Sequence, residues 1–245
     1  MDNSEYNYCL IADDTNRGCV RENNEDYKDH RDTINGRIAV VCDGMGGHVG
    51  GAIASHMAVE TILDFLDDAY IDDPREAITK AIDMANSKIL SHTALHPELT
   101  GMGSTCVLLL IRSGLVYIGH VGDSRIYLVR DRMMRQLTKD HSFVQTLVDA
   151  NRITEEEAER HPRKNEITNA LGTPNMHPAT VREEPINPEA GDIFVLCSDG
   201  LSGMVSAKQI EKVVSDHTQR PKQRIETLIQ LACQNGGLDN ITVSL

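Results

Sequence analysis

Acidic residues that stand beside glycine or asparagine recur at the ends of apolar runs. A single Asp-Gly pair is usually only a turn, because both residues dominate turns. Several such carboxylates gathered at one side of a sheet would repel one another unless a cation neutralised them. Mg²⁺ and Mn²⁺ take oxygen ligands of this kind, so the pattern predicts a divalent metal site. Its carboxylates are Asp43, Asp123, Asp199 and Asp239, with Glu25 and Asp26 upstream of the first run.

The stretch 40–51, VVCDGMGGHVGG, places five glycines within eight residues after Asp43. Glycine-rich turns after strands often bind phosphate through backbone N–H groups, but an aspartate there repels phosphate unless positive charge lies between them. The dinucleotide pattern G-x-G-x-x-G fails because Val49 occupies its last position. The chain also lacks a P-loop and a G-x-S-x-G nucleophile elbow. These other phosphate and nucleophile sites are therefore disfavoured.

Composition limits the remaining classes. The chain has 245 residues, 40% of them hydrophobic, which is enough for a core that needs no disulfides. A net charge of −13 argues against nucleic-acid or anionic-membrane partners. No apolar stretch approaches the roughly 20 residues of a membrane span, and the acidic N-terminus is unlike a signal peptide. Six scattered cysteines without a CxxC pair indicate a reducing, cytoplasmic location.

The elements that must position the carboxylates follow from hydrophobic periodicity. Connections between neighbouring strands are short, which favours antiparallel pairing, and helices come in pairs between blocks of strands, which disfavours a doubly wound sheet. The polar segment 163–178 reads as a mobile surface excursion. Strands are predicted at 6–12, 38–42, 104–111, 115–120, 125–129, 193–197 and 241–245. Helices are predicted at 58–66, from 74 to about 89, at 142–150, at 154–160, and around 210–214 and 225–232.

Eight stretches together resemble the metal-dependent serine/threonine protein phosphatases of the 2C (PPM) type in their bacterial form. They occur in the family's order over nearly the whole chain, and together they are far more specific than any one alone. They are GCVRENNED (18–26), VVCDGMGGH (40–48), MGSTCV (102–107), HVGDSR (120–125), TKDHS (138–142), NEITNALGT (165–173), CSDGLSGMV (197–205) and GLDNITV (237–243).

The resemblance implies an α+β fold: a four-layer α-β-β-α sandwich of two mainly antiparallel sheets flanked by helix pairs. It implies one catalytic domain over residues 1–245, with a mobile flap around 140–178. Two core Mn²⁺ or Mg²⁺ ions would lie at one end of the sandwich, with a third ion as a further expectation. Carried over by position, the implied metal ligands are Asp43 as the bridge, the Gly44 carbonyl, Glu25 with Asp26 close by, Asp199, Asp239 and, for the third ion, Asp123.

The implied activity is hydrolysis of phosphoserine and phosphothreonine in proteins by direct attack of a metal-bridging hydroxide. Arg21 matches the position that grips the substrate phosphate. Met45 stands where eukaryotic members carry a histidine considered a general acid, and Gly203 stands where many members carry another aspartate. For protonation of the leaving group, His48 is the nearest ionisable candidate in sequence, and a metal-bound water is its rival.

The expected partners are phosphoproteins that a serine/threonine kinase has modified, and no nucleic-acid or membrane partner is expected. The protein is expected to be a cytoplasmic monomer. Two other functions stay open. A binding module that had lost catalysis is disfavoured because the implied ligand set is complete. A two-metal hydrolase acting on small phosphate esters is not distinguished by the sequence.

Overall fold

The computed structural model describes residues 9–46 and 49–245. Its strands are β1 (Asp13–Asn16), β2 (Asp26–Thr33), β3 (Gly36–Met45), β4 (Gly103–Ser104), β5 (Cys106–Arg112), β6 (Leu115–Val121), β7 (Arg125–Arg130), β8 (Met133–Gln136), β9 (Thr180–Val181), β10 (Ile193–Cys197) and β11 (Ile241–Ser244). Its α-helices are α1 (Gly50–Asp68), α2 (Pro74–Leu95), α3 (Phe143–Asp149), α4 (Glu155–Glu159), α5 (Asp199–Ser202), α6 (Ala207–Val214) and α7 (Pro221–Gln234).

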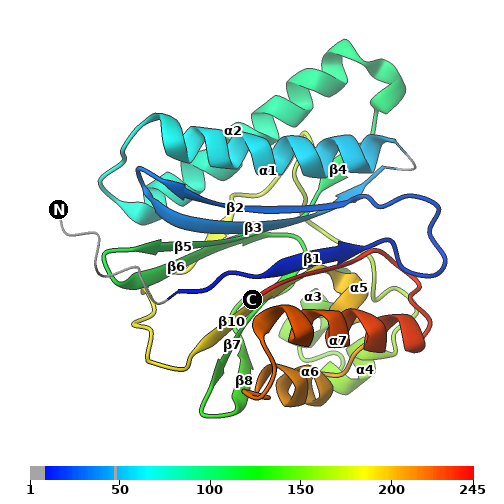
Figure 1. Cartoon of the computed structure of the whole chain (residues 1–245). Helices are drawn as coiled ribbons and strands as arrows, with labels where there is room; N and C mark the ends of the chain where they lie inside the picture. The colour runs from blue at the N-terminus through cyan, green and yellow to red at the C-terminus, as the bar shows by residue number, and fades with distance from the viewer. Residues whose placement is uncertain (1–8, 47–48) are drawn as a thin grey trace.

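The strands form two antiparallel sheets that lie face to face between two layers of helices (Figure 1). One sheet has the order β1-β11-β10-β7-β8, and the other has the order β2-β3-β5-β6-β9, with β4 paired to β3. Helices α1 and α2 cover the outer face of the second sheet, and α6 and α7 cover the first. The predicted α+β four-layer sandwich is confirmed.

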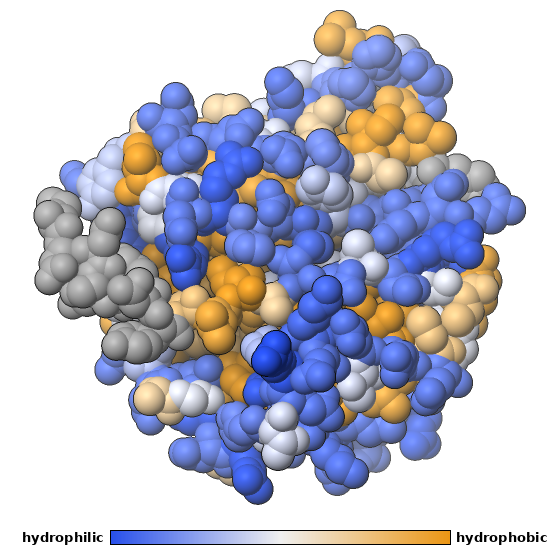
Figure 2. All heavy atoms as spheres, viewed as in Figure 1, coloured by the Kyte–Doolittle hydropathy of each residue, from blue (hydrophilic) through white to orange (hydrophobic). Residues whose placement is uncertain are grey.

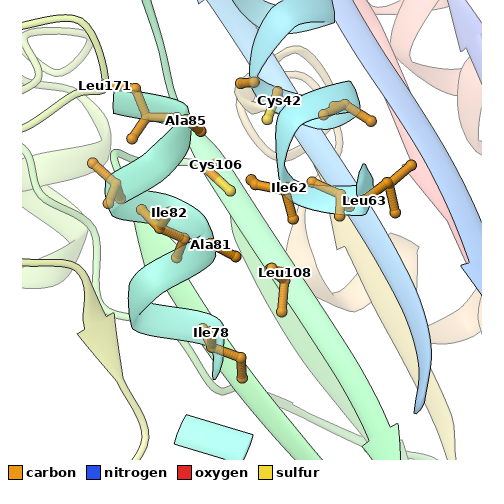
Figure 3. Close-up of a cluster of buried hydrophobic side chains, with 14 of the residues drawn as sticks. Cys42, Ile62, Leu63, Ile78, Ala81, Ile82, Ala85, Cys106, Leu108 and Leu171 are labelled. Carbon is orange, nitrogen blue, oxygen red and sulfur yellow. The ribbon is translucent and has the colours of Figure 1, made fainter. Parts of the chain in front are cut away.

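Alternate side chains of the central strands serve two different layers of the core. In β3, Ile38 and Val40 pack against α1 and α2, whereas Ala39 and Val41 face the other sheet. This alternation follows from the two-residue period of a strand. Figure 3 shows the helix-facing layer, where side chains of α1 and α2 meet those of β3 and β5. Both faces of β3 are therefore buried, which makes it a rigid support for the residues at its end.

The first strand differs from the prediction. Residues 9–12 form no regular element, residues 1–8 lie outside the described part of the chain, and β1 begins at Asp13. Its sequence, DDTN, carries no apolar pattern, because β1 is an edge strand whose pairing with β11 is made by the backbone. The strand is predicted too early in the chain, at 6–12, because the apolar residues lie just before β1.

Two further differences concern the metal-binding end. Strand β2, DYKDHRDT, was not predicted because its side chains are mostly polar and only partly buried. Strand β3 does not stop at Cys42; it continues through Asp43, since Gly44 and Met45 pair with β4. Asp43 therefore sits inside a hydrogen-bonded strand instead of in a turn.

The segment 163–178 contains no α-helix or named strand. It is not wholly superficial, because Ala170 and Leu171 are buried and Leu171 exchanges backbone hydrogen bonds with Ser104 at 2.8 and 3.1 Å. The Asn86 side chain accepts a hydrogen bond from the Gly172 backbone at 2.7 Å. The mobile flap around 140–178 stays a prediction. Among the described residues, no helix combines the length and the apolar character that crossing a membrane requires.

Candidate metal centre

The fold brings the predicted carboxylates to one end of the sandwich. Asp26 opens β2 directly opposite Asp43 in β3, in register across the ladder. Asp199 is the first residue of α5 after β10, and Asp239 precedes β11 by two positions. Asp123 lies in the turn between β6 and β7. The carboxylate of Asp43 feels the negative charges of the other four aspartates, so residues far apart in sequence form one cluster.

The raised pKa values of the clustered aspartates are those expected of a cation site without its cation. Burial, and then the charges of Asp199 and other neighbours, raise the pKa of Asp26 to about 7 and the pKa of Asp123 to about 8. The same causes raise the pKa of Asp43 well above its ordinary value and also raise that of Asp199. One buried oxygen, Asp26 Oδ1, has no hydrogen-bond partner. A buried, mutually repelling set of carboxylates with an unpaired oxygen is suited to a divalent cation.

The side chains are not already gathered into a finished ligand shell. Within residues 9–46 and 49–245, no three His, Cys, Asp or Glu side chains are arranged to hold an ion. Burial, and then the charge of Asp239, raise the pKa of Asp199. Hard cations also take backbone carbonyl and water ligands, so three converging side chains are not a requirement. We place the candidate centre here on its oxygen-only chemistry and its electrostatics.

Two glycines of the motif allow close packing beneath the cluster. A Cβ atom on Gly51 would lie 2.2 Å from Glu25 Oε2, and one on Gly44 would lie 2.1 Å from the Gly51 carbonyl oxygen. The Gly44 N–H donates to the Glu25 carbonyl at 3.1 Å, and Ser55 Oγ donates to the same oxygen at 2.6 Å. The glycines therefore let β2, β3 and α1 approach closely enough to fix Glu25.

Asn240 is a positioning residue that the sequence analysis did not single out. Its Oδ1 accepts the Glu25 backbone N–H at 2.8 Å, while its Nδ2 donates to the carbonyls of Arg17 and Asn23, each at 2.9 Å. It therefore ties the loop 17–25 to the segment that carries Asp239. The available signal was its place beside Asp239 in the GLDN stretch.

Ser198 and Thr105 form hydrogen bonds with two of the aspartates, and the sequence did not indicate this role. The Ser198 hydroxyl donates to Asp26 Oδ2 at 2.7 Å and accepts the Thr242 N–H at 3.0 Å. Thr105 Oγ1 accepts the Asp43 N–H at 3.0 Å. Both hydroxyls stand in quoted stretches, CSDG and GSTC, where a turn or strand role explains them equally well from sequence alone.

Arg21 lies at the rim of the cluster. Its side chain is 53% exposed, and its Nη2 donates to Asp239 Oδ2 at 2.7 Å. The residue predicted to grip phosphate thus contacts a predicted metal ligand in this structure. The guanidinium keeps enough exposed surface to reach a ligand that approaches from solvent. His48 lies outside the described residues.

A surface groove of about 1120 Å³ lies beside the cluster. It is lined by Asn23 and Asn24, by one face of α1 that includes Ile53 and Met57, and by Met84 of α2. Figure 2 shows apolar atoms over the region where α1 begins, at the upper right. The residues that line the groove include none of the clustered aspartates.

The comparisons with known proteins agree with this geometry. The protein phosphatase 2C family matches residues 19–233. The chain belongs to the protein phosphatase 2C family. The resemblance that the eight sequence stretches indicated is confirmed.

Curated relatives of this 2C family member are bacterial phosphatases. Protein phosphatase PhpP of Streptococcus pneumoniae is 39% identical over 243 residues, which cover 94% of both chains. The serine/threonine protein phosphatase PstP of Mycobacterium tuberculosis is 38% identical over 231 residues, which cover 94% of this chain and 43% of PstP. The present chain thus spans less than half of PstP. The expected enzyme class, a protein-serine/threonine phosphatase, agrees with these names.

Solved structures place the chain in the same fold. The serine/threonine phosphatase of S. agalactiae matches with a TM-score of 0.89 and 36% identity, over 96% of this chain and 97% of that one. The catalytic domain of PstP in complex with two manganese ions matches with a TM-score of 0.83 and 36% identity, over 96% of both chains. A related 2C phosphatase therefore holds two manganese ions, which agrees with a metal-dependent family.

Divalent metal should stabilise this 2C domain, and more so at higher pH. Because the folded pKa values of Asp26 and Asp123 lie near 7 and 8, above the ordinary 3.8, the metal-free fold binds more protons than the unfolded chain. The stability that the metal-free fold gains from protonating these two carboxylates is complete below about pH 4 and is lost as pH rises through 7 to 8. We expect Mn²⁺ at a hundredfold excess over its Kd at pH 8 to add about 2.7 kcal/mol there. The same Mn²⁺ concentration should add less at pH 5.5, where protons compete for the carboxylates.

The measurement is the melting temperature in chelator and in Mn²⁺ at pH 5.5 and pH 8. For a domain of this size the gain corresponds to roughly 5–10 °C, larger at pH 8 than at pH 5.5. A melting temperature that ignores millimolar Mn²⁺ at both pH values would contradict the preformed cluster.

Proposed function

We propose that this chain is a metal-dependent phosphoserine/phosphothreonine protein phosphatase. The observation that carries the proposal is the cluster of mutually repelling aspartates at the sandwich end, with the exposed guanidinium of Arg21 at its rim. A site that hydrolyses phosphate monoesters needs cations to offset the phosphate and a group that orients it. The cluster and Arg21 supply the side chains for both.

The proposed ligand roles follow the positions of the carboxylates. Asp43 would bridge two ions with the Gly44 carbonyl beside it, while Glu25, supported by Asp26, would serve one ion. Asp199 and Asp239 would serve the other. The bound Mn²⁺ or Mg²⁺ ions would supply a water activated for direct attack on phosphorus and positive charge for the phosphoryl oxygens.

Arg21 would bind and orient the phosphate. In the structure its guanidinium is held by one hydrogen bond to Asp239, so it must exchange a carboxylate oxygen for phosphoryl oxygens. A guanidinium matches both groups in a forked, two-hydrogen-bond geometry. The ion pair with Asp239 therefore positions the Arg21 side chain close to the proposed phosphate site.

Asp123 is the proposed ligand of a third, weaker ion. Asp123 is buried, and burial together with the charge of Asp199 raises its pKa to about 8, so a nearby cation would favour its ionised form. We expect Asp123→Ala to keep the stoichiometry of the two core ions but to lower kcat several-fold. Calorimetric Mn²⁺ binding and peptide kinetics across Mn²⁺ concentrations measure both. Parental turnover at every Mn²⁺ concentration would remove Asp123 from this role.

Protonation of the serine leaving group separates two proposals. A serine alkoxide leaves poorly and needs an acid, whereas an aryl oxide hardly does. If His48 is the acid, His48→Ala should slow a phosphoserine peptide at least about tenfold more than an aryl phosphate. Steady-state kinetics on the two substrates provides the ratio. Equal slowing of both, or of neither, would leave a metal-bound water as the acid.

A substrate panel tests the proposed function against its rivals. We expect phosphothreonine and phosphoserine peptides to be hydrolysed in Mn²⁺ with higher kcat/KM than small alkyl phosphates. The opposite ranking would favour a hydrolase of small phosphate esters. Peptide binding without turnover in saturating Mn²⁺ would indicate a binding module. As further parts of the proposal, the substrates are proteins modified by a serine/threonine kinase, and the enzyme acts as a cytoplasmic monomer.

A further inference from the structure

Two cysteines from opposite ends of the chain contact each other beside the proposed centre. Cys19 lies in the loop between β1 and β2, and Cys233 lies in the last turn of α7, 214 positions later. Cys19 Sγ donates a weak hydrogen bond to the Cys233 carbonyl oxygen at 3.8 Å. Burial, and then the neighbouring Cys19 side chain, raise the pKa of the Cys233 thiol. The Cys19 N–H also donates to the Gly237 carbonyl at 2.8 Å. These contacts place the Cys19 side chain against the last turn of α7, which carries Cys233.

The chain also contains a second pair of cysteines, which is buried. Cys42 and Cys106 lie on the neighbouring strands β3 and β5, and both are fully buried beneath α1 and α2 (Figure 3). Cys19, by contrast, is exposed, and Cys233 is half-buried. Oxidants in solution reach exposed thiols and spare buried ones, so these two neighbouring pairs should behave differently.

We propose that Cys19 and Cys233 form a reversible disulfide when the protein meets hydrogen peroxide. The Cys19 thiolate attacks one peroxide oxygen, which yields a sulfenic acid and one water after proton transfer. The Cys233 thiolate then attacks the Cys19 sulfur, and the sulfenic hydroxyl leaves as a second water. Two thiols are oxidised, one peroxide is reduced, and a dithiol such as dithiothreitol reverses the bond.

The crosslink would act on the ion pair at the rim of the cluster. Cys19 is two residues before Arg21, and Gly237, which contacts Cys19, is two residues before Asp239. The contact is already tight, since a Cβ atom on Gly237 would lie 2.8 Å from Cys19 Sγ. A bond from this loop to α7 should hinder the movement of Arg21 from Asp239 to phosphate. This consequence rests on the proposed function, whereas formation of the bond does not.

Mapping the bond is the first arm of the test. The full chain is reduced, exposed to hydrogen peroxide, blocked with a thiol reagent, and digested without reduction for mass spectrometry. We expect one linked peptide pair, Cys19 with Cys233, and free thiols at Cys42 and Cys106. Cys19→Ser and Cys233→Ser should each abolish the linkage, and Cys9→Ser should not. Oxidation that leaves residues 19 and 233 unlinked, or that links other cysteines first, would overturn the proposal.

Activity is the second arm. Peroxide should raise the KM of the parent for a phosphothreonine peptide about tenfold, the lower range for losing a charge-assisted hydrogen bond. Dithiothreitol should restore the original KM. In Cys233→Ser, the KM should be the same before and after peroxide treatment. A linked protein with unchanged KM would overturn the coupling to Arg21. Absence of activity even in the reduced parent would count against the proposed function, while the first arm would still decide the disulfide.

Discussion

Asp43→Asn should remove most turnover of a phosphothreonine peptide and most Mn²⁺ affinity together. Asp43 is the residue on which the charges of four other aspartates converge, and it is held in β3 opposite Asp26. Losing an outer partner of a metal ligand typically costs about 10- to 100-fold, so losing the shared ligand should cost roughly a hundredfold or more in kcat. Asparagine keeps the shape and removes the charge. Peptide kinetics and calorimetric Mn²⁺ binding measure both effects.

Two further variants sharpen this prediction. Asp239→Asn should also lower activity strongly, because it removes a carboxylate of the same cluster. Asp67→Asn, at an exposed position of α1, makes the same chemical change away from the cluster and should match the parent. Parental activity and Mn²⁺ affinity in Asp43→Asn would contradict the proposed centre.

Arg21→Ala should weaken binding of the phosphopeptide while metal binding persists. The guanidinium at the rim would contribute charge-assisted hydrogen bonds to phosphate, each worth about 1.5–3 kcal/mol, so KM should rise at least about tenfold. The same substitution removes the ion pair that Arg21 makes with Asp239. Mn²⁺ affinity should therefore stay equal or increase. Steady-state kinetics and Mn²⁺ titration of the same preparation distinguish the two effects.

Arg31→Ala is the matched control for that variant. Arg31 is a surface guanidinium bound to Asp64 of α1 at 2.8 Å, so it makes a comparable ion pair away from the cluster. Its loss should leave KM unchanged. Arg21→Lys should recover only part of the loss, because an ammonium cannot form the fork. Unchanged KM and kcat in Arg21→Ala would mean that Arg21 does not meet the phosphate.

The sequence predicts the layers and the cluster well where an apolar run marks a strand and an acidic residue marks the end of that strand. The long buried strands and both helix pairs carry strong patterns, so the sequence predicts that they exist. Their ends are less well predicted, since α1 begins at Gly50 and not at 58, and α2 continues to Leu95 beyond 89. The polar strand β2 carries no such pattern, since its place is fixed by backbone bonds to β3 rather than by buried side chains. The end of β3 was missed for the same reason: its last residues are held by pairing with β4.

Roles that arise from three-dimensional contact were beyond the sequence. Asn240 and Ser198 look like turn residues until their hydrogen bonds to the Glu25 backbone and to Asp26 are known. The Arg21–Asp239 pair joins residues 218 positions apart, and the Cys19–Cys233 contact is equally remote. No local spacing encodes such pairs, because tertiary contacts, such as the pairing of β1 with β11, bring the two ends of the chain together.

The most direct test of the metal-centre account is phosphate release from a phosphothreonine peptide as chelator-treated protein is titrated with Mn²⁺. We expect no significant release without metal, activity that rises and saturates as Mn²⁺ fills the aspartate cluster, and loss of that rise in Asp43→Asn. Equal phosphate release with chelator and with saturating Mn²⁺ would contradict it.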